Sequence, residues 1–320
     1  MSDVSSPTRT PVSVAVAAVR ALRPKQWAKN VMILAPLVFS SVYLTDPFKM
    51  VEAFLAVASF SLLASSGYLL NDYLDRAADR QHPKKKKRPI ASGALPESVA
   101  LVEMVVVLAC GAALAWYLSP TFLAVGLAYL VTTMLYSFFL KHIVILDVMI
   151  LSSFYLLRVI AGAAAIEVRV SEWLFLCTAF LALFIGFHKR RAELVQLGTA
   201  GSTRKILQQY SLPMLDQYQA IVTGAVVLCY ALYTALGSAT PWMTLTIPFV
   251  LYGIFRYVWL VDQKGEGDAP DETLIKDGPI LVTGVLYGLT VVGLLVAHGN
   301  GWLPDIFQVP LPGRLGIGPS

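Results

Sequence analysis

Residues 71–93, NDYLDRAADRQHPKKKKRPIASG, directly follow the apolar stretch 53–70. A long apolar run predicts a membrane-spanning helix, and the polar residues behind it mark the helix end. The segment begins with one asparagine and three aspartates; three of these four residues are spaced by four, and the other is adjacent to the first, so on a helix they share one face. These four residues are Asn71, Asp72, Asp75 and Asp79. The segment therefore predicts a hydrophobic helix with an acidic end, followed by the basic run 84–88.

The composition is that of a membrane protein. Of the 320 residues, 57% are hydrophobic and only 14% are charged, and the mean hydropathy is +0.66. Soluble domains carry about a quarter charged residues. No charge occurs in 104–140 or in 220–255. Because a membrane-spanning helix needs roughly 20 apolar residues, each of these stretches can hold two helices, with turns near Pro120 and Pro241.

We expect an all-α polytopic membrane protein with nine transmembrane helices. Long continuous apolar runs favour helices over a β-barrel, whose strands would alternate in polarity. The first span is the weakest, because Pro36 interrupts it. The expected spans are 27–45, 51–71, 98–118, 121–140, 143–166, 172–190, 218–237, 241–262 and 279–298.

The distribution of lysine and arginine predicts the orientation, because cytoplasmic loops are enriched in both. Twenty of the 25 lie on the side of the 71–97 loop and three lie on the opposite side. We expect a multi-pass protein of the cell membrane with its N-terminus and the 71–97 loop in the cytoplasm and its C-terminus outside. The net charge of +5 reflects this asymmetry and does not indicate a nucleic-acid partner.

The expected parts of the chain are an N-terminal segment 1–20, a transmembrane domain 21–298 and a tail 299–320. The N-terminal region lacks the apolar core of a cleavable signal peptide. The three cysteines all lie in expected spans, so they predict neither a disulfide framework nor a metal site. They are Cys110, Cys177 and Cys229.

The acidic helix end suggests a magnesium site. Neighbouring carboxylates repel one another unless a cation lies between them, and carboxylate and amide oxygens suit Mg²⁺, which completes its shell with ligand phosphates. We expect Asn71 and Asp75 to be direct ligands, and Asp72 and Asp79 to lie in the same site or behind it. The alternative is a solvated helix end without a function.

Cations recur at three further places. The run 84–88 either binds phosphates beside the metal or only attracts anionic lipid. A second cluster, FHKRRAEL at 187–194, combines cations with Glu193 at the end of the sixth expected span. Arg158 lies inside the fifth span, where a charge is costly and faces the bundle interior. For Arg158, as for Asp147 and Arg256, intramembrane ion pairing is the structural alternative to phosphate binding.

The string NDYLDRAADR resembles the first aspartate-rich motif of the UbiA superfamily of intramembrane prenyltransferases. The resemblance covers about 20–298 and implies a nine-helix bundle with cytoplasmic cap loops. Several segments resemble the decaprenyl-phosphate phosphoribosyltransferase branch of that superfamily. They are LRPKQWAKN (22–30), HPKKKKRPIASG (82–93), LKH (140–142), YLLRVIAGA (155–163), HKRRAEL (188–194), FRYVWLVD (255–262) and PDETLIKD (270–277).

One departure separates the branches. Members that transfer a prenyl group carry a second aspartate-rich motif after the sixth span, where this chain has Lys189, Arg190 and Glu193. The exchange favours a donor richer in phosphate, such as phosphoribosyl pyrophosphate. The resemblance then implies Mg²⁺-dependent transfer of a 5-phosphoribosyl group to a polyprenyl (decaprenyl) phosphate, with membrane lipid as the surroundings; a homo-oligomer is compatible with this interpretation.

The resemblance also implies roles for individual residues. The implied catalytic residues are Asp72, Asp75 and Asp79, and the implied metal ligands are Asn71 and Asp75. The implied substrate-binding residues are Lys29, Asn30, Lys85, Arg88, Tyr136, Lys141, Arg158, Lys189, Arg190, Glu193 and Arg256.

Two other functions remain open at this point. A prenyltransferase of the same fold would use a prenyl diphosphate and an aromatic or polyol acceptor, but would need the second acidic motif. A transporter or non-enzymatic membrane protein would explain the spans but not the acidic face. A CDP-alcohol phosphotransferase is disfavoured because its D-x-x-D-G-x-x-A-R string is absent.

Overall fold

The computed structural model describes residues 11–40, 42, 46–81, 85–197, 205–264, 273 and 276–304, and all regular secondary structure in this part of the chain is helical. The expected all-α class is confirmed. The chain divides into two compact units, residues 1–187 with 199–211 and residues 188–198 with 212–320. The expected division at 20 and 298 stays a prediction.

The first unit combines long helices with short helical turns that precede or follow them. The long helices are α3 (Phe48–Leu74), α5 (Glu97–Leu118), α6 (Pro120–Phe138), α7 (Leu146–Ala165) and the first part of α8 (Glu172–Leu197). The shorter ones are α1 (Pro11–Ala21), η1 (Pro24–Leu34), α2 (Ala35–Ser40), α4 (Arg76–Gln81), η3 (Lys85–Lys87), η4 (Leu140–His142) and η5 (Lys205–Gln209).

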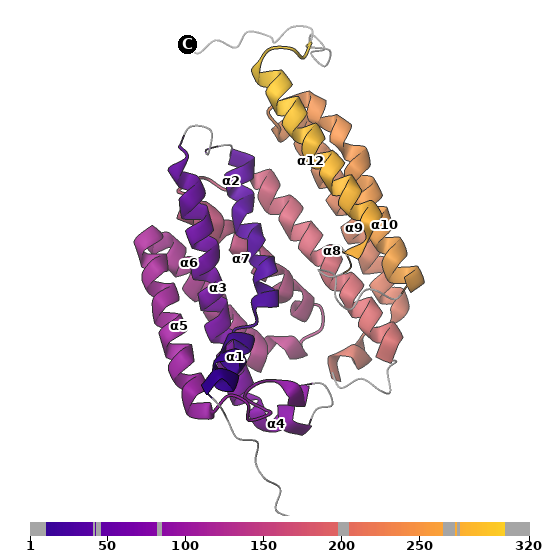
Figure 1. Ribbon diagram of the computed structural model, residues 1–320. Coiled ribbons are helices and arrows are strands. Elements are labelled where there is room, and N and C mark those ends of the chain that lie inside the picture. The colour runs from indigo at the N-terminus through magenta and orange to yellow at the C-terminus, as the bar shows by residue number, and fades with distance from the viewer. Residues whose placement is uncertain are drawn as a thin grey trace, which may run out of the picture. The chain divides into compact units, whose positions relative to one another are not determined.

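Helix α3 is the centre of the first unit and packs against α5, α6 and α7, which lie beside it in Figure 1. Small residues such as Ser59 are fully buried on it, and the Ser59 hydroxyl donates a 2.8 Å hydrogen bond to the carbonyl of Gly111 on α5. The ring of Phe60 packs on that of Tyr129, with 4.8 Å between their centroids. This packing holds the C-terminal end of α3, which carries the acidic residues.

The η1 segment crosses α7 at very close range. A Cβ atom on Gly162 would lie 2.0 Å from the carbonyl oxygen of Ile33, so only glycine fits at this crossing. The crossing places Asn30, three residues before Ile33, beside Arg158, four residues before Gly162.

The second unit contains the end of α8 and the helices that follow it. They are α9 (Leu212–Leu232), the π-helical η6 (Tyr233–Gly237), the 3₁₀-helical η7 (Pro241–Thr246), α10 (Ile247–Lys264) and α12 (Gly278–Gly299). Helix α10 packs against both α9 and α12. The hydroxyl of Tyr230 on α9 lies 2.6 Å from that of Thr246 and 3.2 Å from that of Tyr287 on α12.

Eight helices of the described residues are long and apolar enough to cross a membrane, by length and composition. They match eight of the nine expected spans in order. The remaining span, 27–45, contains the 3₁₀ helix η1 and the six-residue α2 in its described part. Pro36 has no N–H to donate, which is tolerated only in the first turn of an α-helix, and α2 accordingly begins at Ala35. The sides on which loops and termini lie remain a prediction.

Candidate functional site

The acidic residues lie where α3 gives way to α4. Asp75 ends α3, with its N–H donating to the carbonyl of Asn71 at 2.9 Å, and the N–H of Asp79 donates to the carbonyl of Asp75 at 2.8 Å. Asp72 and Asp79 are buried, Asn71 is half-buried and Asp75 is exposed. The predicted ligand pair is therefore the more exposed one, whereas Asp72 and Asp79 are buried, and an arginine holds one carboxylate oxygen of each.

Arginine side chains hold the two buried carboxylates. Arg88 Nη1 lies 3.0 Å from Asp72 Oδ1 and 2.7 Å from Asp79 Oδ2, so one guanidinium bridges both acids. Arg23 Nη2 donates to the same Asp72 oxygen at 2.5 Å. Lys85 Nζ is 4.0 Å from Asp79 Oδ1. Opposite charges thus meet at the end of α3, as a ligand with metal-bound phosphates requires.

The segment 85–95 packs against α1 and α3 and carries Arg88. Ile90 and Leu95 are buried in a cluster with Ala21 of α1 and Leu69 of α3. The three lysines 85–87 are exposed, whereas the Arg88 side chain is only 27% exposed. The basic run is therefore not uniform: Arg88 is half-buried against the acids, Lys85 is exposed but lies near Asp79, and Lys86 and Lys87 are exposed. Lys84 lies outside the described residues.

Arg158 and Asn30 form a buried polar network at the middle of α3. Arg158 Nε donates to Asn30 Oδ1 at 2.8 Å, and Asn30 Nδ2 donates to the hydroxyl of Ser61 at 2.8 Å. Arg158 also donates to the Tyr129 hydroxyl at 3.3 Å and to the Phe154 carbonyl at 2.8 Å. Within the described part of the chain Arg158 has no carboxylate partner, so its charge is held by neutral oxygens and aromatic faces.

The other predicted residues of the first unit occupy less buried positions. Lys29, Tyr136 and Lys141 are half-buried. The ring of Tyr136 meets Phe154 edge-on, with 6.1 Å between centroids. Asp147, which we considered for an ion pair, accepts a 2.7 Å hydrogen bond from the Tyr210 hydroxyl.

The end of α8, in the second unit, carries three consecutive cations, Lys189 to Arg191, followed by the single acid Glu193. Arg190 is almost completely buried and donates to Glu193 Oε2 at 2.5 Å, so these two charges neutralise one another. Lys189 is half-buried. Arg256 on α10 pairs with Asp277 at 3.0 Å and lies over the Trp259 ring at 4.5 Å, which is the structural role we considered for it.

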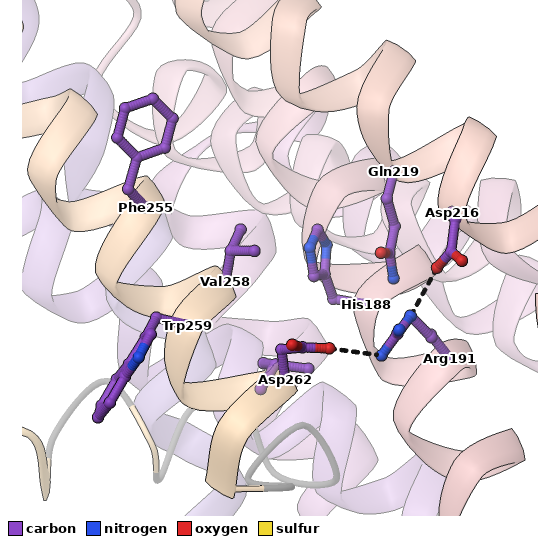
Figure 2. A pocket seen from close by; sticks show the side chains of 9 residues that line it. His188, Arg191, Asp216, Gln219, Phe255, Val258, Trp259 and Asp262 are labelled. Carbon is purple, nitrogen blue, oxygen red and sulfur yellow. Dashed lines mark hydrogen bonds and ion pairs between the residues drawn. The ribbon is translucent and has the colours of Figure 1, made fainter.

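A pocket of about 490 Å³ lies in the second unit and is shown in Figure 2. Arg191 projects into it and pairs with Asp216 of α9 at 2.6 Å and with Asp262 of α10 at 3.3 Å. The other lining residues are His188, Gln219, Phe255, Val258, Trp259 and Val261. Two carboxylates flank a single guanidinium, so the charges do not favour a phosphate here. Sequence reasoning missed Asp216 and Asp262, because single acids on separate helices form no motif.

The oxygen atoms at the end of α3 are of the kind that Mg²⁺ prefers. No group of three or more His, Cys, Asp or Glu side chains close enough to hold a metal occurs among the described residues. Mg²⁺ commonly uses only one or two carboxylates and takes its other ligands from phosphates and water. Asp75 is exposed beside Asn71, and Asp72 Oδ2 accepts no hydrogen bond from a described residue, since both arginines donate to Oδ1. Carboxylate and amide oxygens are thus available on one side of the helix end.

Known proteins resemble this chain over most of its length. A protein-family model described as the UbiA prenyltransferase family matches residues 31–274. A decaprenyl-phosphate phosphoribosyltransferase of Mycobacterium tuberculosis H37Rv is 36% identical over 299 residues, which cover 91% of this chain and 98% of the relative. Its namesake from Corynebacterium glutamicum is 34% identical over 295 residues, covering 88% and 87%. The solved structure of a UbiA homolog from Archaeoglobus fulgidus bound to GPP and Mg²⁺ has the same fold, with a TM-score of 0.65 at 17% identity, covering 86% of this chain and 97% of the homolog.

Proposed function

Because this chain belongs to the UbiA prenyltransferase family, we propose that it transfers the 5-phosphoribosyl group of phosphoribosyl pyrophosphate to a polyprenyl phosphate and releases diphosphate. Relatives that match 91% and 88% of this chain carry the name decaprenyl-phosphate phosphoribosyltransferase, which supports decaprenyl phosphate as the acceptor. The observation that carries the proposal is the bridging of Asp72 and Asp79 by Arg88, with Arg23 beside them. This arrangement places cations directly against the acids, as a polyphosphate donor with its metal requires.

The acceptor needs no general base in this reaction. A polyprenyl phosphate is already an anion, so its oxygen attacks C1 of the ribose directly. The new bond joins C1 to that oxygen, and the bond from C1 to the diphosphate oxygen breaks with its electron pair on the diphosphate. The transition state is oxocarbenium-like, and we expect inversion at C1.

The residues at the end of α3 would stabilise the leaving group. Asn71 and Asp75 would hold Mg²⁺, which supplies positive charge to the departing diphosphate when it is bound. Arg88 and Lys85 would contact the phosphate oxygens that remain, because charged donors make the strongest bonds to phosphate. Holding the donor at a fixed place against a lipid acceptor supplies a further part of the rate enhancement.

By the resemblance described above, Lys189 at the end of α8 is implied to bind a phosphate of the donor. Arg190 is already paired with Glu193, so it contributes less net charge to a ligand. By the resemblance described above, prenyl-transferring members of the family have acids at this place. A prenyl diphosphate carries no phosphate group beyond its diphosphate. The cations therefore favour the ribosyl donor over the prenyl donor.

A donor competition tests the proposal. Purified protein in lipid nanodiscs receives labelled phosphoribosyl pyrophosphate and a labelled prenyl diphosphate together, with decaprenyl phosphate, and lipid products are separated. We expect ribosyl transfer only, with loss of product when EDTA removes the metal. Consumption of the prenyl diphosphate in place of the ribosyl donor would leave only the family membership standing. No transfer from either donor would contradict the enzymatic role with these substrates.

A further inference from the structure

Arg23 lies in the segment LRPKQWAKN but was not among the site residues that the resemblance implied, and it contacts Asp72 directly. Its backbone is left-handed, with φ 55° and ψ 58°, a conformation that is uncommon for any residue other than glycine. Pro24 follows it and disfavours a right-handed helical conformation at the preceding residue. The chain therefore turns sharply at Arg23, between the end of α1 and the start of η1.

The neighbours of Arg23 in the chain are fastened to α3. The Ser65 hydroxyl contacts the Leu22 carbonyl at 2.9 Å and accepts a hydrogen bond from Trp27 Nε1 at 3.1 Å. Ser65 is completely buried. One serine of α3 thus holds the chain on both sides of the turn, which fixes the position from which the Arg23 side chain starts.

The side chain of Arg23 then follows the same face of α3. Its guanidinium lies over the ring of Tyr68, 5.1 Å from the centroid, and reaches Asp72 Oδ1 at 2.5 Å. Ser65, Tyr68 and Asp72 are three and four residues apart, so they share one helix face. The backbone turn, the Tyr68 ring and the Asp72 carboxylate together determine the orientation of the Arg23 side chain.

Arg23 and Arg88 do different things at Asp72. Both contact Oδ1, but Arg88 also holds Asp79, whereas Arg23 contacts only Asp72 among the described acids. With Oδ1 engaged twice, the carboxylate cannot rotate, and Oδ2 has one fixed orientation. Oδ2 accepts no hydrogen bond from a described residue.

We propose that Arg23 is a positioning residue of the donor site: it holds Asp72 so that Oδ2 is aimed at the divalent cation carried by the donor diphosphate. The inference rests on the proposed function only in naming the donor. Outer contacts of this kind orient metal ligands, and their loss typically lowers metal affinity by about 10- to 100-fold.

The test measures metal binding rather than turnover. Full-length protein in nanodiscs is titrated with Mn²⁺ in the presence of inorganic diphosphate, and free Mn²⁺ is followed by electron paramagnetic resonance. We expect Arg23→Gln to weaken Mn²⁺ binding by about tenfold or more and Arg23→Lys to recover most of the loss. Arg20→Gln is the matched control, because Arg20 is exposed in the last turn of α1 and should leave binding unchanged.

The direction in which Arg23→Gln changes Mn²⁺ affinity separates two roles of Arg23: orienting Asp72 for the metal, and competing with the metal for Asp72. If Arg23 only competed with the metal for Asp72, its removal would tighten Mn²⁺ binding, and this result or an unchanged affinity would overturn the proposal. In an Asp72→Asn background, Arg23→Gln should have no further effect, since it acts through that carboxylate. An equal loss in both backgrounds would also overturn it.

Two further variants and readouts keep the inference separate from folding and from the proposed function. Tyr68→Leu retains the charge at Arg23 and removes only the ring that aims it, so it should weaken Mn²⁺ binding several-fold even if Arg23→Gln does not fold. Thermal unfolding in the same nanodiscs checks each variant. If ribosyl transfer fails in the donor competition while the Mn²⁺ effects hold, the donor assignment is wrong and the role of Arg23 stands.

Discussion

At the residue scale, Asp75 and Arg88 show that neighbouring charged residues have different roles according to their burial. Asp75 is exposed where α3 ends, free to meet a ligand from outside, while Asp72 and Asp79 are turned inward to arginine. A buried carboxylate needs a partner because desolvation of its charge is costly, and Arg88 provides one partner for two acids. The exposed carboxylate of Asp75 is therefore available to bind a ligand.

Asp75→Ala should abolish turnover while the protein stays folded. The side chain is exposed, so its loss removes little stability, but it removes a ligand of the cation that stabilises the leaving diphosphate. We expect kcat to fall by at least about 100-fold, measured with labelled donor at saturating Mg²⁺. Glu97→Ala is the control, because Glu97 forms only partly exposed ion pairs with Arg76 and Arg80. Activity of Asp75→Ala close to that of the unchanged protein would rule out the ligand assignment.

Lys189→Ala should raise the KM for phosphoribosyl pyrophosphate and change kcat less. Charge-assisted contacts to phosphate are worth about 1.5–3 kcal/mol, or roughly ten- to a hundredfold in binding. Lys189→Asp should raise the KM further, because it repels the same phosphate. Lys86→Ala, which removes an exposed lysine, serves as the control and should leave KM within about twofold. A KM unaffected by both Lys189 variants would refute the role of this lysine.

Arg158→Leu should destabilise the protein. It leaves the buried Asn30 Oδ1 without its donor and empties a place between three aromatic rings. An unsatisfied buried group costs about 1–3 kcal/mol, which thermal or denaturant unfolding in detergent can measure. Arg169→Leu, at an exposed arginine, should have little effect. Equal stability of the two variants would mean that the network contributes nothing to the fold.

At the scale of elements, the crossing of η1 and α7 sets the position of Asn30 and Arg158. Two segments that are distant in the chain approach so closely that the Ile33 carbonyl fills the space of a side chain at Gly162. Small residues permit such approaches between membrane helices. The polar network therefore depends on one glycine that takes no part in it.

Gly162→Ala should lower stability by about 1–3 kcal/mol, because the added Cβ forces η1 away from α7. Gly224→Ala in α9 is the matched control, since a Cβ there meets nothing within 4 Å. This second change should be neutral or slightly stabilising, because alanine favours a helix over glycine by about 1 kcal/mol. Unfolding curves that order the two variants the other way would contradict the close crossing.

At the scale of the whole molecule, the distribution of charge predicts that the acidic end of α3 and the basic end of α8 face the cytoplasm. Twenty lysines and arginines lie on that side of the expected topology and three on the other. An enzyme that uses a soluble phosphorylated donor needs its site on the side where the donor is available. The predicted topology and the proposed function therefore both require the site to lie on the cytoplasmic side.

Single cysteines at Gln81 and Gln196 test this topology. Both positions are exposed, at the end of α4 and near the end of α8. In a background without Cys110, Cys177 and Cys229, both should react only with membrane-permeant thiol reagents in intact cells. Labelling of either position by an impermeant reagent would place that helix end outside the cell.

The sequence by itself determined the class of the protein, most of its helices and the acidic end of α3. Apolar length and the spacing of four residues are local properties, and a membrane-spanning segment satisfies its backbone hydrogen bonds within itself. Eight of the expected spans accordingly appear in the structure. The resemblance of NDYLDRAADR to a family motif is equally local, and the family membership is confirmed.

Only the tertiary structure decided which charges meet. Arg23 and Asp72 are 49 residues apart, Asn30 and Arg158 are 128 apart, and neither pair leaves a pattern in the chain. The pairing of Arg191 with Asp216 and Asp262 likewise requires three helices to pack together. The first expected span became a 3₁₀ helix and a short α-helix that pack against α3 and α7. Hydropathy reports how apolar a segment is, whereas the partner of a buried charge depends on packing between segments, and packing is not a local property.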